Sequence, residues 1–252
     1  IWYVDVADPA AVVRKHPESD HRVARAFAGR MYPDLPVASA GSGALADHAA
    51  PDAPRVYIGS FPGLTVVCAA ELVSPRPSRV PPAWVRPLAS ERTYLVATDP
   101  ARRWGGFAWW ERGVLRRAFS ATAIHIIEDE GLPGTWELPF WSGRRPQRRP
   151  AGAMPDPREL PFDPQEFADG ASRTWLGFGF TVPEEGGDVE APDPAEIVLS
   201  MIVEMTSDTP RVTLSQPAMP AQMPPVTIAT SIATATSERS PPESSERRLT
   251  FL

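Results

Sequence analysis

An α+β or α/β domain is the fold class that the sequence predicts, with a mixed, largely antiparallel sheet, a few helices packed on one face, and a disordered C-terminal tail. Predicted strands outnumber predicted helices. Many connections between strands are too short for a crossover, which favours antiparallel neighbours. A chain of 252 residues buries roughly 70% of its unfolded surface on folding, enough for a core without disulfides.

The tail is predicted from where the aromatic residues stop. All eight tryptophans lie between Trp2 and Trp175, and after residue 180 the only Phe, Trp or Tyr is Phe251. From residue 206 onward the chain is rich in Pro, Ser, Thr, Ala and Met, and such a segment cannot bury enough apolar surface to offset its ordering entropy. We therefore expect a globular domain at residues 1–205 and a mostly disordered tail at residues 206–252.

The first third of the chain predicts one strand and two helices. Asp8 followed by Pro9 is typical of a helix start, because the carboxylate caps free amides and proline suits the first helical position. A second helix is expected from Ser19 or Asp20, with apolar residues three to four positions apart. These elements are a buried strand at 1–6, a helix up to Lys15, and a helix up to Met31 whose core stripe is Val23, Phe27 and Met31.

Later segments predict two tight turns and a further helix. Pro62-Gly63 joins two strands, and Arg112-Gly113 closes an aromatic hairpin because Gly113 can adopt the positive φ of a tight turn. In this hairpin Trp110 is expected opposite Leu115, and Trp109 opposite Arg116. The remaining expectations are strands at 56–61, 64–69, 93–98, 123–127 and 197–205, a short strand at 36–40, an added edge strand at 226–234, loops at 136–141 and 155–162, and a helix capped by Asp163 or Asp169 that runs through Trp175.

Composition limits the classes of function. With 25 basic and 31 acidic residues the net charge is −6, which argues against a general nucleic-acid surface. The single cysteine, Cys68, excludes an intramolecular disulfide and is typical of a reducing, cytoplasmic location. No apolar run reaches the ~18 residues that cross a bilayer, so no membrane contact is expected. Residues upstream of Ile1 could extend the first strand or hold a targeting segment.

Lysine is nearly absent from the chain. Of the 25 basic residues only Lys15 is lysine, which with the 31 prolines suggests a GC-rich genome and disfavours Schiff-base or phosphate-lysine chemistry. The run from Arg144 to Arg149 is interpreted as a solvated loop or, alternatively, as a dock for phosphate or an acidic partner.

Tryptophans supply the first candidate site. Phe107, Trp109 and Trp110 place large rings on both faces of one strand, so at least one ring needs cover beyond the nearest sheet face. The rings either belong to a core strand or form an exposed aromatic platform. The candidate partner surface comprises Trp109, Trp110, Trp136 and Trp141.

Acidic residues supply the second candidate site. One imidazole and three carboxylates follow one another in His125, Glu128, Asp129 and Glu130, the types used in acid/base and metal chemistry. The alternative is a strand that ends in a solvated acidic turn. The candidate catalytic residues are Glu128, Asp129, His125, Asp5 and Asp8, although Asp8 already has a capping role. No metal site is predicted with a recognised ligand spacing, and no cofactor is evident.

Two shorter motifs carry less information. Gly41-Ser-Gly43 before a helix at 44–48 could hold an anion, but it lacks the spacing of a phosphate loop and is interpreted as a turn. Cys68 lies in an apolar run and is interpreted as a small buried hydrophobe rather than a nucleophile.

Several sequence blocks together resemble an uncharacterised actinobacterial family, a domain of unknown function. The resemblance covers roughly Ile1 to Met205 and excludes the tail. It implies a small cytosolic α/β protein and no catalytic residue, and it suggests that a short lead-in precedes the first strand in the family. The blocks are Ser60-Phe-Pro-Gly-Leu-Thr-Val-Val-Cys68, Arg76-Pro-Ser78, Trp110-Glu-Arg-Gly113, Ile127-Glu-Asp129 and the segment from Pro161 to Phe178.

Two functional hypotheses follow. The first is a non-catalytic binding or interaction module whose aromatic surface meets a protein partner. The second is a hydrolase-like enzyme, metal-assisted in one version, that uses the clustered carboxylates. We favour the module, because the enzyme requires scattered carboxylates to converge without a motif that places them.

Overall fold

The structure, a computed structural model, describes residues 1–34, 41–49, 55–147, 154, 156–180 and 191–204. All of these belong to the first of two units, which comprises residues Ile1–Thr209. The predicted strands at 36–40 and 226–234 and the predicted tail lie outside the described residues. So does part of the loop predicted at 155–162.

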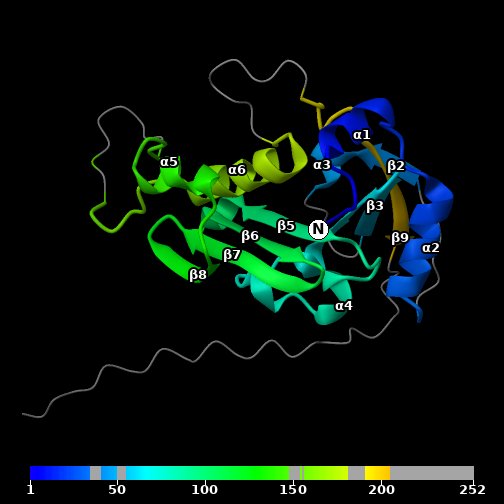
Figure 1. The fold of residues 1–252 in the computed structure, drawn as a ribbon, viewed down its shortest axis with the longest axis horizontal. Helices are drawn as coiled ribbons and strands as arrows, with labels where there is room; N and C mark the ends of the chain where they lie inside the picture. Colours follow the sequence, from blue (N-terminus) through cyan, green and yellow to red (C-terminus); the bar gives the residue numbers. More distant parts are fainter. Residues whose placement is uncertain (35–40, 50–54, 148–153, 155, 181–190, 205–252) are drawn as a thin grey trace, which may run out of the picture. The chain divides into compact units, whose positions relative to one another are not determined.

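A nine-stranded sheet forms the centre of the described domain (Figure 1). The described strands pair with one another in antiparallel fashion throughout, as most of the predicted connections require. In spatial order the strands are β2 (Gly41–Ala44), β9 (Val198–Glu204), β3 (Arg55–Phe61), β4 (Leu64–Ala69), β1 (Trp2–Val4), β5 (Arg92–Asp99), β6 (Trp104–Glu111), β7 (Val114–Thr122) and β8 (His125–Gly131).

Helices cover both faces of this sheet, where the sequence predicted one. The first face packs against α2 (His21–Met31) and α4 (Pro82–Val85), in a core that contains Tyr3 and Trp110. The second face packs against α1 (Pro9–Lys15), α3 (Leu45–His48), α5 (Leu138–Trp141) and α6 (Pro164–Leu176). Alternating side chains of the strands are apolar on both sides, so one layer of helices could not cover them. Short 3₁₀ turns, η1 (Ala70–Leu72), η2 (Pro77–Arg79), η3 (Pro100–Arg102) and η4 (Thr135–Glu137), join the other elements.

Aspartate side chains cap the N-terminal ends of three helices. The side chain of Asp8 accepts a hydrogen bond from the amide of Ala11, Asp20 caps α2, and Asp163 caps α6. These helix starts confirm the predicted ones. The predicted stripe of α2 is wrong at Val23, which is 51% exposed, because the small side chains of Ala24 and Ala28 lie against the sheet with Phe27.

Both predicted tight turns are present. Gly63 has φ +67° between β3 and β4, and Arg112 and Gly113 both have positive φ between β6 and β7. Trp110 lies opposite Leu115, as expected. Trp109 lies opposite Arg117 rather than Arg116, because a β-bulge shifts the register by one residue.

Three segments differ from their predicted structure. The strand predicted at 123–127 begins later and continues through the acidic residues, because the side chains of Glu128 and Asp129 have partners inside the domain. Residues 136–141, predicted as a loop, belong to η4 and α5. Residues 41–43, predicted as a turn, belong to β2, which pairs with β9. The strands predicted at 56–61, 64–69, 93–98 and 197–205 are present among the described residues, and the first predicted strand is shortened to Trp2–Val4.

Candidate functional site

The bulge opposite Trp109 places Arg117 inside the domain. Its side chain is 2% exposed and lies near the rings of Phe107 and Phe119, on the face covered by α5 and α6. The guanidinium donates from Nε and Nη2 to the two carboxylate oxygens of Glu137, at 3.0 and 2.8 Å. Nη1 donates to Asp129 and to two backbone carbonyls. Arg117 therefore holds β8 and η4 together.

The buried charge of Arg117 is stabilised by its hydrogen-bond and ion-pair partners. Burial by itself lowers the pKa of the Arg117 guanidinium, but its hydrogen bonds and ion pairs with Glu137 and Asp129 raise that pKa above the usual value. The guanidinium of Arg117 therefore stays charged at neutral pH. A buried arginine with bidentate partners of this kind fixes geometry more than it adds net stability.

Glu137 also fixes the segment that follows β8. The carboxylate of Glu137 accepts a hydrogen bond from the amide of Gly134 at 2.9 Å, so it anchors the backbone of this short segment. Trp136 and Trp141 pack their rings on Phe167 of α6, with centroids 5.3 and 5.9 Å away. We refer to residues 132–141 as the apolar segment.

The apolar segment exposes two leucines to solvent. Leu132 is 88% exposed and Leu138 is 58% exposed, while Trp136 and Trp141 are half-buried beside them in the sequence. Exposed apolar side chains that form a contiguous patch are typical of an interaction site. The segment therefore contains half of the predicted aromatic surface together with exposed aliphatic residues that the sequence analysis did not select.

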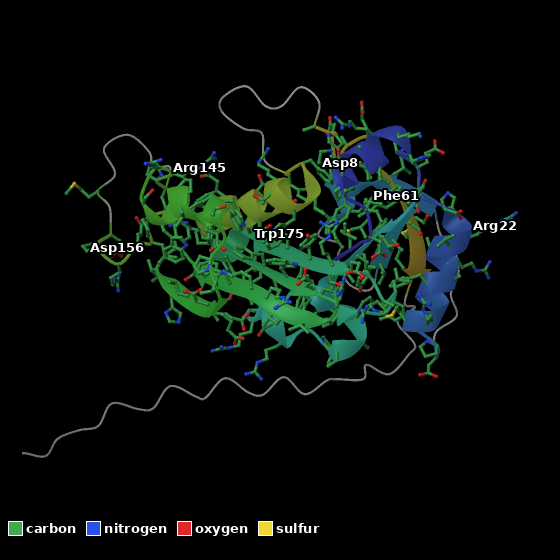
Figure 2. The ribbon with its side chains drawn as sticks, in the orientation of Figure 1. Asp8, Arg22, Phe61, Arg145, Asp156 and Trp175 are labelled. Carbon is green, nitrogen blue, oxygen red and sulfur yellow. The ribbon has the colours of Figure 1, made fainter. Side chains whose placement is uncertain are left out.

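The four predicted surface tryptophans do not form one surface. Trp110 is 4% exposed and packs in the core on the opposite face of the sheet, so its assignment to a partner surface is wrong. Trp109 is half-buried and lies near Trp175, which stacks on Tyr94 at 4.8 Å. Figure 2 labels Trp175 at the end of α6. Alternation along β6 separates Trp109 from Trp110, since successive side chains point to opposite faces.

The predicted carboxylates have separate partners in the structure. Glu128 is buried and accepts hydrogen bonds from the amide and hydroxyl of Ser78, at 3.0 and 2.6 Å. Asp129 accepts a hydrogen bond from Arg117. His125 is exposed at the start of β8.

Asp5 and Asp8 lie elsewhere, after β1. Asp5 accepts a hydrogen bond from the amide of Glu91 at 2.7 Å, and Asp8 caps α1. Within the described residues, no three His, Cys, Asp or Glu side chains are grouped so that they could hold a metal ion.

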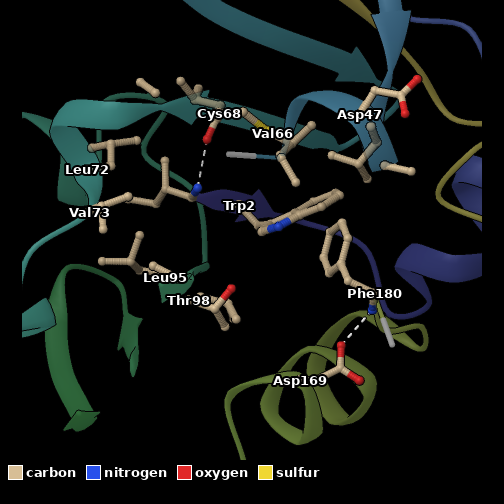
Figure 3. Close-up of a pocket in the computed structure, with 18 of the residues that line it drawn as sticks. Trp2, Asp47, Val66, Cys68, Leu72, Val73, Leu95, Thr98, Asp169 and Phe180 are labelled. Carbon is tan, nitrogen blue, oxygen red and sulfur yellow. Dashed lines mark hydrogen bonds between the residues drawn. The ribbon is translucent and has the colours of Figure 1, made fainter. Parts of the chain in front are cut away.

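A cavity of about 290 Å³ lies beyond the N-terminal end of β1 (Figure 3). Its lining includes the end of β4 at Cys68 and Ala69 and the segment of β5 from Val96 to Thr98. β1 pairs with β4 as far as Val66 and with β5 as far as Tyr94, so these lining residues lie beyond the pairing partners of β1. Burial raises the pKa of the Cys68 thiol to about 11, which disfavours its thiolate.

A serine of β9 and a histidine of α2 also meet. Ser200 Oγ lies 2.7 Å from His21 Nδ1 and donates to Ser19 Oγ at 3.1 Å. His21 Nδ1 donates to Ser200 in the tautomer that leaves the Ser200 hydroxyl proton for its hydrogen bond to Ser19. Ser200 is fully buried on β9, so this pair holds α2 to the sheet rather than presenting a nucleophile.

Sequence reasoning missed Arg117, Glu137 and Leu132. The sequence around Arg117 has the alternation common to strands, and Glu137 is one of 31 acidic residues, so neither residue is distinguished by its local sequence. The only local signal was Gly-Thr-Trp-Glu at 134–137, where a glutamate three residues after a helix start suggests a capping interaction.

The described residues thus define an α+β domain with an antiparallel sheet between two layers of helices. The chain belongs to the family described as "Family of unknown function (DUF6928)", whose model matches residues 1–201. This match confirms the resemblance to a family of unknown function. No curated protein and no solved structure matches the chain. Among the described helices, none has the length and apolar character needed to span a membrane.

Proposed function

We propose that this domain is a non-catalytic interaction module and that the apolar segment is its contact surface for a protein partner. The observation that carries the proposal is the exposure of Leu132 and Leu138 on a segment anchored by a buried ion pair. Exposed leucine on a fixed backbone offers apolar area to a partner with little loss of conformational entropy on binding. The flanking Trp136 and Trp141 add aromatic area of the kind that is enriched in protein interfaces.

Composition supports three finer parts of the proposal. The net charge of −6 fits a protein partner better than a nucleic acid. The single cysteine fits a cytoplasmic location. The arginine-rich, lysine-poor composition fits an actinobacterial source.

The hydrolase alternative has less support. Glu128 and Asp129, its main candidates, already accept hydrogen bonds from Ser78 and Arg117, and Glu128 is buried. A general base needs access to its substrate, which this arrangement of Glu128 does not offer.

The test compares tagged wild-type protein with a Leu132→Ser, Leu138→Ser double variant in cells of the source organism. We expect wild type to retain a partner whose cross-links map to residues 132–141, and the double variant to lose it. A double variant at two exposed valines elsewhere, Val73→Ser and Val114→Ser, is the matched control and should retain the partner. Retention of the same partner by the leucine variant, with unchanged cross-links, would overturn the proposal.

A further inference from the structure

Among the described strands, β8 has a neighbour on one side of its backbone only. It lies at the end of the strand order, and of the described strands β7 is its pairing partner (Figure 1). In an antiparallel edge strand, alternate residues direct their N–H and C=O groups away from the sheet. β8 has seven residues, whereas β2 at the other edge has four. β8 is therefore long enough to pair with a segment of ordinary strand length.

Exposed apolar side chains lie at both ends of this strand. Ile124, just before β8, is 50% exposed, and Leu132 follows its last residue. A strand that paired with β8 would place its own side chains beside both residues and would reduce their contact with water. The edge is also continuous in sequence with the apolar segment.

Charge indicates which kind of segment would pair. Asp129 and Glu130 are exposed and lie on opposite faces of the sheet, since they are consecutive in a strand. Arg117 contacts one oxygen of Asp129, whose side chain remains 45% exposed. A second copy of β8 would bring carboxylates opposite carboxylates, which is unfavourable. Basic side chains on an incoming strand would meet opposite charge on both faces.

We propose that β8 accepts an extended, basic segment of the protein partner, which pairs with it as an additional strand. The inference rests on the proposed function and names the conformation and charge of the partner. Backbone hydrogen bonds would supply affinity, while Asp129 and Glu130 would supply selectivity for lysine or arginine. Asp129 and Glu130, together with the register shift between β7 and β8, disfavour pairing of this edge with a second copy of the chain.

A synthetic peptide of about eight residues, in which pairs of lysines alternate with pairs of valines so that both faces of the strand carry lysine, is the probe. The control peptide carries proline in place of each valine, which keeps the charge and removes amide donors from both edges of the peptide. We expect the lysine–valine peptide to bind about tenfold more tightly or better. It should also slow amide exchange in residues 125–131 and leave residues 41–44 unchanged. Equal binding of the two peptides, or slowed exchange only outside β8, would overturn the inference.

Charge variants test the selectivity. Glu130→Lys should weaken binding of the lysine–valine peptide about tenfold, whereas Asp34→Lys makes the same charge change at an exposed position after α2 and should leave it unchanged. Equal weakening by both variants would show general attraction to an acidic protein and would overturn the inference. So would a dimer in solution that is cross-linked through β8.

The two proposals can fail separately. If neither peptide binds but the Leu132→Ser, Leu138→Ser variant still loses the cellular partner, the β8 inference is wrong and the interaction module stands. If the leucine variant keeps its partner while the lysine–valine peptide protects β8, the contact surface proposed at the apolar segment is wrong and the strand edge is the binding site.

Discussion

The side chain of Arg117 helps to position the apolar segment, which lies later in the sequence. The bulge next to Trp109 turns Arg117 toward α5 and α6, where it meets Glu137 and Asp129. Glu137 in turn fixes the backbone that exposes Leu132 and Leu138. A guanidinium suits this position because its planar fork donates to two partners at once, which the ammonium of a lysine cannot reproduce.

Replacing Arg117 tests this role. Arg117→Met leaves the buried Glu137 carboxylate without its counter-charge, so we expect a loss of about 3–5 kcal/mol in the free energy of unfolding. Arg116→Met, which removes an exposed ion pair with Glu111, is the matched control and should cost less than about 1 kcal/mol. Urea unfolding measures both. Adding Glu137→Met to Arg117→Met should recover part of the loss, and equal costs for Arg116→Met and Arg117→Met would contradict the assigned role.

Cys68 predicts a dependence of stability on alkaline pH. Burial raises the pKa of its thiol from 9.0 to about 11, so between these values the unfolded chain ionises and the folded protein does not. The stabilisation is therefore complete below about pH 9 and is lost as the pH rises through about 11. A shift of this size corresponds to roughly 2–3 kcal/mol.

Comparison with a Cys68→Ala variant isolates this contribution. Unfolding free energies from pH 8 to pH 11.5 should converge between the two proteins as the pH rises, because the wild type alone loses the thiol contribution. The tyrosines Tyr3 and Tyr32, whose pKa values burial also raises, are common to both proteins. A difference that stays constant over this range would show that the thiol is not effectively buried.

At the scale of elements, the position of α6 is constrained by its close approach to β6. Asp163 caps the helix and Pro164 occupies its first turn, so the helix start could be predicted from the sequence. Its position over the sheet depends on Gly105 in β6. A Cβ atom at Gly105 would lie 2.0 Å from the carbonyl oxygen of Pro164, so glycine alone permits this distance.

Gly105→Ala should therefore move the start of α6 away from the sheet. We expect a loss of about 1–3 kcal/mol in the free energy of unfolding, together with weaker near-ultraviolet circular dichroism from the aromatic cluster. Gly143→Ala is the control, because its Cβ meets no heavy atom within 4 Å, and its φ of +72° alone should cost about 1 kcal/mol. An unchanged aromatic signal in Gly105→Ala would contradict the close packing of α6.

Strand order is the property of the whole molecule that the sequence left open. β1 pairs with β4 and β5, and β9 inserts between β2 and β3, so the first and last described strands both lie inside the sheet. Local patterns identified most of these strands and their antiparallel character. They contained no information on which distant strand each one would join, because hydrophobic alternation fixes the face of a strand and not its neighbour.

The candidate site divides in the same way between the sequence and the fold. Trp136 and Trp141 were selected from the sequence as surface residues and are half-buried in the apolar segment. Trp110 was selected on the same grounds and is buried, since alternation turned it toward the other face. Glu128 and Asp129 were expected at a solvated strand end, but Ser78 and Arg117 extend β8 through them.

The sequence by itself determined the fold class, the helix starts at Asp8, Asp20 and Asp163, and the turns at Gly63 and Gly113. The helix starts and turns depend on residues within about four positions of one another, where capping and positive φ act. The tertiary structure decided the strand order, the burial of the Arg117–Glu137 pair and the exposure of the apolar segment. Those depend on packing between residues far apart in the chain, whose free energy depends on neighbours that no local pattern specifies.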